Sequence, residues 1–333
     1  MKKIFALLIS LALILSLSSG TIAFAAGATA PSKETWKIQK GDETYTGSFQ
    51  YKYNTKAKTM TCLAKGSLSF YRATGDFLWP SSVNGRNVVL DCLLWDEYDA
   101  VITAMALHPL FTSGRIQKVV LQYDDPEERT ESIRFTRNSD GQVSKAVLKI
   151  AGGNLGWNQT KTYSFTYDSN GNITRLLLAD TNSIGPFYSE ELGPVVEYTD
   201  KRFVYVSGTL TSAVWQTSRD NVLEGMRVYD DTYAFVYRTD DAGRVTKCVR
   251  RDWPWDDLLF NYTVSYQSEG LPKKAHLTAP IGMVELFGET FADEEDPIYN
   301  ITWKFGYKNG QLRTIKELQD SWEYRSTITH IKL

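Results

Sequence analysis

Short runs in which apolar and polar residues alternate fill much of the chain, and Tyr163–Leu178 shows this pattern most clearly. Side chains of a β-strand point to alternate faces, so Phe165 and Tyr167 are predicted to share one face. Beyond the turn, the same alternation places Ile173 on one face with Arg175. Aromatic and β-branched residues are typical of a pleated, half-buried surface. The pattern therefore predicts two antiparallel strands.

The five residues between these runs, Asp168–Asn172, read D-S-N-G-N. Aspartate and asparagine can hydrogen-bond to nearby backbone, and Asn-Gly tolerates a positive φ angle at little cost. We therefore predict a β-hairpin, and we assign Asp168 and Asn170 to turn formation and not to catalysis.

Similar units recur along the chain. Each has an extended run, a polar turn with a glycine and a second run: Ile133–Ile150, Tyr163–Leu178, Arg202–Trp215, Tyr233–Val249, Asn261–Leu277 and Ile301–Leu318. Self-similarity on this scale indicates a repeat architecture. The predicted fold is all-β, an antiparallel meander of repeated β-hairpins that forms one long twisted sheet with one or two short helices. A β-propeller is the alternative, although its blades need four strands each and these units hold two.

One segment departs from this pattern. In Asp91–Leu107 the apolar residues recur at spacings of three and four, which predicts an amphipathic helix that Pro109 ends. A second short helix is predicted in Pro280–Phe291. An open sheet of about twelve strands would leave two free edges, and these helices are candidates to cover an edge or one face.

The run F-T-Y-D-S-N-G-N-I-T-R-L resembles the YD repeat of the RHS family of large secreted bacterial proteins, and residues 140–145 and 240–247 are similar to its second half. The resemblance covers about residues 115 to 320. It implies hairpins that pair edge to edge into long curved sheets, and it transfers no catalytic residues. We divide the chain into a signal peptide (1–25), N-terminal strands with a helix packing on the sheet (26–114) and a YD-like hairpin region (115–333).

The N-terminus predicts export. Lys2 and Lys3 precede an apolar run, Ile4–Leu17, and Ala23-Phe24-Ala25 forms a small-x-small cleavage site. No cysteine follows the run, so a lipoprotein anchor is not expected, and an uncleaved anchor is the alternative. We expect a secreted protein with no integral membrane span after cleavage. Its formal charge of −2, or −4 without the two signal lysines, argues against nucleic acid as a partner.

Three cysteines, Cys62, Cys92 and Cys248, are too few for a disulfide scaffold, although one pair is possible. We interpret them as packing residues. The three histidines are scattered, so the sequence predicts no metal site and no cofactor.

The predicted function is non-catalytic binding of an extracellular or cell-envelope ligand, with a glycan as one candidate. Trp253 and Trp255 are the candidate ligand-binding residues, because they lie in a polar loop and can stack on sugar rings. The alternative is a glycosidase-like hydrolase that uses two carboxylates from acidic stretches, with these candidates: Asp96, Glu97, Asp99, Asp256, Asp257, Glu294 and Glu295. Calcium binding by the acidic loops Asp124–Glu131 and Phe291–Pro297 is a further possibility.

Overall fold

The computed structural model describes these residues: 29–66, 97–123, 129–152, 157–182, 195–221, 226–252, 258–268, 270–280, 298–319 and 322–333. The chain divides into two compact units, one of Met1–Ala30 with Ile331–Leu333 and one of Pro31–His330. The described residues of the smaller unit are the first two residues of one strand and the last residues of another. The larger unit, Pro31–His330, contains both helices and all of β2–β16.

The described residues form one 17-stranded sheet and two helices. The strands are β1 (Thr29–Lys40), β2 (Glu43–Asn54), β3 (Thr59–Lys65), β4 (Lys118–Tyr123), β5 (Arg129–Arg137), β6 (Val143–Gly152), β7 (Trp157–Tyr167), β8 (Ile173–Asn182), β9 (Val195–Val206), β10 (Thr209–Asn221), β11 (Met226–Thr239), β12 (Val245–Asp252), β13 (Leu258–Tyr266), β14 (Pro272–Pro280), β15 (Ile298–Lys308), β16 (Gln311–Leu318) and β17 (Trp322–Lys332). The helices are α4 (Glu97–Leu107) and α5 (Pro109–Thr112).

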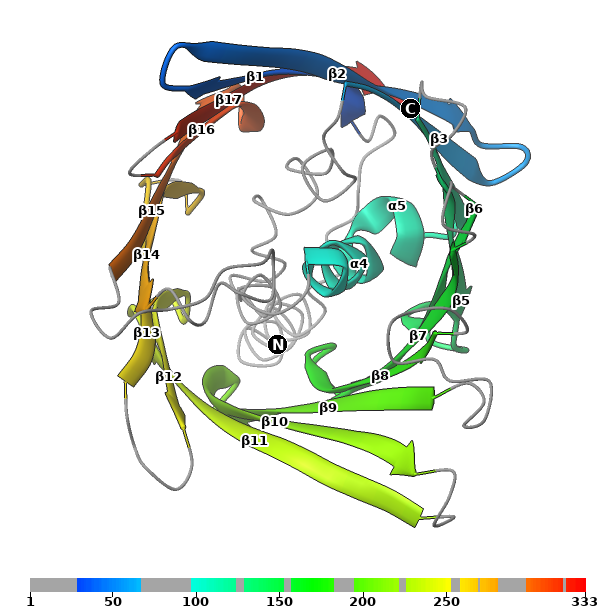
Figure 1. Cartoon of the computed structure of the whole chain (residues 1–333), viewed down its shortest axis with the longest axis vertical. Coiled ribbons are helices and arrows are strands. Elements are labelled where there is room, and N and C mark those ends of the chain that lie inside the picture. Colours follow the sequence, from blue (N-terminus) through cyan, green and yellow to red (C-terminus); the bar gives the residue numbers. More distant parts are fainter. Residues whose placement is uncertain are drawn as a thin grey trace, which may run out of the picture. The chain divides into compact units, whose positions relative to one another are not determined.

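The sheet closes on itself. Each strand pairs with the next one along the chain, and β1 also pairs with β17, so the described strands form a barrel without a free edge (Figure 1). Across this seam, Ser32 Oγ donates a hydrogen bond to Thr329 O at 3.1 Å. The prediction of one long open sheet with two edges is therefore wrong. A strongly twisted sheet rarely exceeds about ten strands without curling, and closure buries the apolar face of every strand at once.

One strand pair is parallel. Strands that follow each other along the chain are antiparallel except for β3–β4, where Thr59 lies opposite Lys118 and Ala64 opposite Tyr123. A closed sheet of strictly alternating strands needs an even number, so a barrel of 17 strands must contain at least one parallel pair. The chain therefore returns from one end of the barrel to the other between Lys65 and Lys118.

The two helices lie in this return and fill part of the interior (Figure 1). All six side chains of 101–106 in α4 are buried, and α4 contacts β6. The Phe111 ring of α5 lies 4.7 Å from the Phe135 ring of β5. A helix that is buried all round belongs to a core, so α4 covers the inner face of the sheet.

A helix is confirmed over Glu97–Leu107, but its predicted amphipathic character is wrong over 101–106, because these residues are buried on every side. Residues 91–96 lie outside the described residues. Pro109 ends α4 but also begins α5, because His108 caps the new turn with Nδ1 accepting from Leu110 N at 3.2 Å. The second predicted helix, beyond Pro280, lies outside the described residues.

Most side chains that point into the barrel are apolar and most that point out are polar, but Glu34 and Lys201 are buried and Val236 is exposed. In β6, Ala146, Leu148 and Ile150 are buried, whereas Lys145 and Lys149 are exposed. The largest fully buried side chains are Trp215, Tyr163, Tyr262, Phe49, Phe111, Lys201, Phe235, Met60 and Ile102. The core is thus the inner face of the barrel together with α4 and α5.

The β7–β8 hairpin confirms the predicted turn. Asp168 Oδ1 accepts from the backbone N–H of Asn170 at 2.8 Å and of Asn172 at 2.9 Å. Gly171 has a φ of +77° and donates its N–H to Asp168 O at 3.0 Å. Asp168 therefore organises the turn, as its sequence context predicts.

The predicted face of Ile173 is wrong, because a β-bulge follows it. Tyr167 pairs with Ile173 but Thr166 pairs with Arg175, so Thr174 is an extra residue and Ile173 turns back into the core. Thr174 Oγ1 donates to Thr166 O at 3.3 Å.

One-residue register shifts recur in other hairpins, and in two of them the extra residue repeats the contact of Thr174: Ser144 Oγ donates to Thr136 O and Thr246 Oγ1 donates to Arg238 O. The similar triplets V-S-K, I-T-R and V-T-K therefore encode a turn followed by a bulge. The resemblance to the RHS family is corrected accordingly, because these hairpins close a barrel and do not extend a long curved sheet.

Candidate functional site: a basic groove on the outer wall

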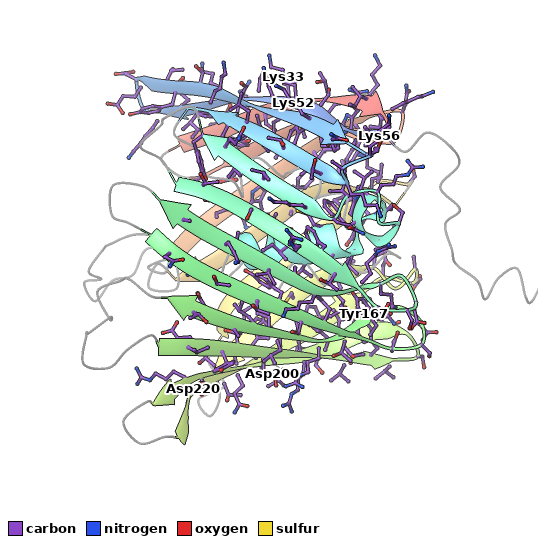
Figure 2. The ribbon with its side chains drawn as sticks, turned by 90° about the vertical axis from the view of Figure 1, so that its right-hand side faces the viewer. Lys33, Lys52, Lys56, Tyr167, Asp200 and Asp220 are labelled. Atoms are coloured by element: carbon purple, nitrogen blue, oxygen red, sulfur yellow. The ribbon has the colours of Figure 1, made fainter. Side chains whose placement is uncertain are left out.

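The outer wall of β1–β7 is basic. Its outward-facing described positions include no aspartate or glutamate and hold eight cations: Lys33, Lys37, Lys52, Lys65, Lys118, Arg134, Lys145 and Lys149. Figure 2 shows Lys33 and Lys52 pointing away from the barrel. Since the formal charge of the whole chain is −2, this basic wall arises from the arrangement of the charges and not from composition.

Farther round the wall, Asp200 and Asp220 also point outward (Figure 2). Asp200 is paired on both sides, with Arg175 Nε at 2.7 Å and Arg202 Nη2 at 2.8 Å. Partial burial opposes the charge of Asp200, but hydrogen bonds from both arginines outweigh it and lower the pKa of this carboxyl. This part of the wall also carries exposed valines, Val204 and Val214 among them, beside the charged groups.

At one end of the wall the surface is hollowed into a groove of about 640 Å³. It lies where the β2–β3 turn, the start of β4 and the end of β5 meet, next to the parallel strand pair. Four cationic residues line it, Lys58, Lys118, Arg134 and Arg137, and none of the described residues that line it is acidic. We refer to this site as the basic groove.

Backbone hydrogen bonds hold one side of the basic groove. Lys58 has a φ of +55°, in the left-handed region, and its carbonyl oxygen accepts from Gln117 N at 2.8 Å and Lys118 N at 3.2 Å. A non-glycine residue in this region is uncommon and needs support from its surroundings. The turn thus fixes Lys58 beside the first residue of β4.

Arg137 is held on the opposite side. Its Nη1 donates to Thr112 O at 3.1 Å, which links the end of β5 to α5. The guanidinium lies so close to Gly114 that a Cβ atom there would fall 2.4 Å from Arg137 Cζ. Gly114 also has a φ of +72°, so both its space and its backbone conformation favour glycine.

Lys118 and Arg134 lie directly opposite each other on β4 and β5, and both face outward. Like charges in directly opposed positions destabilise a sheet. Within the described part of the chain, neither side chain has a carboxylate partner. The arrangement is therefore suited to an anion that binds from outside.

The structure does not describe the predicted binding residues. Trp253 and Trp255 lie in 253–257, outside the described residues. Of the candidate catalytic carboxylates, only Glu97 and Asp99 fall in a described element, the first turn of α4. These predictions therefore remain untested.

Two of the three cysteines are described. Cys62 and Cys248 are buried and form no disulfide with each other, in agreement with packing roles, and burial raises the pKa of the Cys62 thiol. Cys92 lies outside the described residues. No group of three or more potential metal ligands occurs among the residues that the structure describes. None of the helices in those residues is long and apolar enough to cross a membrane.

No protein-family model matches the chain, and no curated protein matches it. Among solved structures, it is similar to a porin-like protein from Bacteroides vulgatus, with 10% identity, a TM-score of 0.33 and coverage of 64% of this chain and 96% of that one. It is also similar to a porin-like protein from Bacteroides uniformis, with 11% identity, a TM-score of 0.24 and coverage of 56% of this chain and 96% of that one. A DUF1329 family protein from Desulfovibrio piger is similar with 8% identity, a TM-score of 0.20 and coverage of 97% of this chain and 90% of that one. With TM-scores below 0.5, these likenesses carry no argument about function.

The sequence contains a signal for the basic wall that the pattern analysis missed. In β6 the outward positions read Lys145, Val147, Lys149, and in β1 they read Lys33, Thr35, Lys37. Once it is known which residues of each strand face outward, the sequence shows that none of the described outward positions in β1–β7 is acidic. The groove itself requires the β3–β4 pairing, which local sequence does not encode.

Proposed function

We propose that the protein is a secreted β-barrel binding protein whose basic groove holds an anionic group of an extracellular or cell-envelope ligand. One observation carries this proposal: four cations from three separate segments surround one concavity that no described acidic residue lines. Convergence of like charge without internal compensation is costly unless a ligand supplies the opposite charge.

The groove suits a short acidic ligand. About 640 Å³ is within the range of small-molecule sites. Arg134 and Arg137 offer planar guanidinium groups that can bind carboxylate or phosphate in a bidentate manner, and Lys58 and Lys118 add point charges. Thr136 and Asn138 line the same groove and supply neutral hydrogen-bonding groups. A carboxylated sugar would use both kinds of contact.

Export through the N-terminal segment would bring this groove to the cell envelope or the exterior, where acidic glycans occur. Trp253 and Trp255 remain our proposal for stacking on a sugar ring of the same ligand. The double variant Trp253→Ala/Trp255→Ala tests this part separately, because unchanged affinity would remove both residues from the site.

The groove is tested by titrating residues 26–333 with trigalacturonate and with inorganic triphosphate in a calorimeter. The variant Lys118→Gln/Arg134→Gln removes two groove charges. The matched control is Arg238→Gln/Lys247→Gln, which removes a directly opposed cationic pair from β11–β12 outside the groove. The groove variant is expected to bind about tenfold more weakly, since two charged contacts are lost. Equal affinity in both variants, or no binding by the native chain, would contradict the proposal.

A further inference from the structure

Four outward-facing cations form a row across β14–β17. Lys274 lies opposite Lys304, Lys304 lies opposite Lys316, and Lys316 lies opposite Arg325. Each of these pairs joins neighbouring strands, so the row runs across the strands at one level of the wall. None of the four belongs to the basic groove. We refer to this row as the cation ladder.

One carboxylate compensates half of the ladder. Glu323 Oε2 lies 2.8 Å from Lys316 Nζ, and Glu323 Oε1 accepts from Arg325 Nε. Hydrogen bonds from Arg325 and Lys316 lower the pKa of Glu323, so it stays ionised. Lys274 and Lys304 are exposed, and within the described ranges neither has an acidic partner. With four cations and one carboxylate, the ladder has a net charge of +3.

The spacing of the ladder fits an extended polymer. Neighbouring strands lie about 4.8 Å apart, so the ladder presents one cation at each such step along a line. A compact anion would reach only one or two of these positions. A chain with one negative group in each repeat could follow the whole ladder.

The neighbouring side chains indicate what kind of polymer fits. Outward-facing threonines flank the ladder on both sides, with Thr302 beside Lys304 and Thr327 beside Arg325. The Thr302 hydroxyl lies 2.9 Å from Nδ1 of His276, which stands beside Lys274, so a hydroxyl and an imidazole both face a ligand there and can exchange hydrogen bonds with sugar hydroxyls. No Trp, Tyr or Phe lies among the outward-facing described residues next to the ladder, and both ring nitrogens of His276 are engaged by threonines, whereas proteins that bind single-stranded nucleic acid use a series of aromatic stacking platforms.

We propose that the cation ladder binds a linear acidic polysaccharide with one carboxylate in each sugar residue. The proposal goes beyond the groove and does not depend on it, because the two sites share no residue. The carboxylates would lie over the cations and the sugar hydroxyls over the threonines. A flat membrane surface fits less well, because the four cations lie on a curved wall and a plane would contact few of them at once.

The experiment uses residues 26–333 and long-chain polygalacturonate, with binding measured by biolayer interferometry. The variant Lys274→Gln/Lys304→Gln removes the two uncompensated steps. The control Lys145→Gln/Lys149→Gln makes the same change of charge on β6, where both lysines lie opposite neutral residues. The ladder variant is expected to bind about tenfold more weakly and the control within about twofold of the native chain. The ladder variant should also melt at a higher temperature than the native chain, because a like-charge contact is removed.

Three comparisons would overturn the proposal. Equal losses in the ladder and control variants would show that charge alone matters. Methyl-esterified polygalacturonate that binds as well as the free acid would remove the role of the carboxylates. Polyphosphate or anionic phospholipid vesicles that bind more tightly, with the same loss in the ladder variant, would assign the ladder to another partner. All these measurements are made in the Lys118→Gln/Arg134→Gln background, in which the groove contributes little to binding of the galacturonate polymer, so a failure of one site leaves the other standing.

Discussion

Closure of the barrel depends on a buried contact between the two ends of the sheet. Tyr324 of β17 donates from its hydroxyl to Glu34 Oε1 of β1 at 3.1 Å, and both side chains are at most 3% exposed. Removing a hydroxyl that donates to a buried carboxyl oxygen costs about 1–3 kcal/mol, because the acceptor loses that donor. Tyr324→Phe should therefore lower the free energy of unfolding by about 2 kcal/mol. Tyr51 reaches Oε2 of the same carboxylate at 3.4 Å, so Tyr51→Phe should cost less.

Urea unfolding followed by tryptophan fluorescence measures this change. The matched control is Tyr45→Phe. The Tyr45 hydroxyl also donates to a glutamate, Glu43, but both residues lie on β2 and both are exposed. The control should leave stability almost unchanged. A double-mutant cycle with Glu34→Gln isolates the contact between strands. Zero coupling between Tyr324 and Glu34, with Tyr324→Phe no worse than the control, would refute the closed sheet.

Four further substitutions test other parts of the fold. Gly47→Ala should cost about 3 kcal/mol, because the new Cβ would lie 2.1 Å from the carbonyl oxygen of Lys65, whereas Gly41→Ala, with a φ of +56° and open space, should cost about 1 kcal/mol in the same urea assay. Asp168→Ala should cost about 1–2 kcal/mol at an unchanged m-value, since two turn N–H groups lose their acceptor. The folded pKa of Asp200 lies below its usual 3.8, so its stabilisation is complete above that value and is lost as the pH falls through the folded value. Asp200→Asn should therefore flatten the loss of stability below pH 3.8, and an unchanged acid profile would exclude this role.

Local chemistry made the hairpins predictable. The turn at Asp168–Asn172 needs a short polar acceptor and a residue with positive φ, and the sequence states both. The phase of Ile173 was not predictable by simple alternation, because the Thr174 bulge shifts the register by one residue. Alternation alone assumes a regular ladder, which the bulge interrupts.

Closure was not predictable in this way. An open and a closed sheet have the same alternation of inward and outward residues, and the difference lies in pairing between strands that are far apart in sequence. Ser32 and Thr329 meet across 297 positions. The parallel β3–β4 pair likewise depends on a return of the chain past α4 and α5, which no turn signal encodes.

One part of the candidate site could be predicted from the sequence and another part could not. The basic character of the wall is contained in the outward phase of strands such as β6, where Lys145 and Lys149 alternate with core residues. The groove brings together Lys58, Lys118 and Arg137 from segments that only the fold joins. Trp253, Trp255 and the acidic stretches were the candidates at the level of sequence, because they form clusters along the chain.

The central claim is that the basic groove binds an anion, and lysine-selective NMR tests it most directly. Reductive methylation with ¹³C keeps each lysine charge and gives each side chain its own signal. On titration with trigalacturonate, the signals of Lys58 and Lys118 are expected to shift and saturate together, while that of Lys247, outside the groove, stays in place. Signals of Lys58 and Lys118 that do not move, or that move no more than that of Lys247, would contradict the claim.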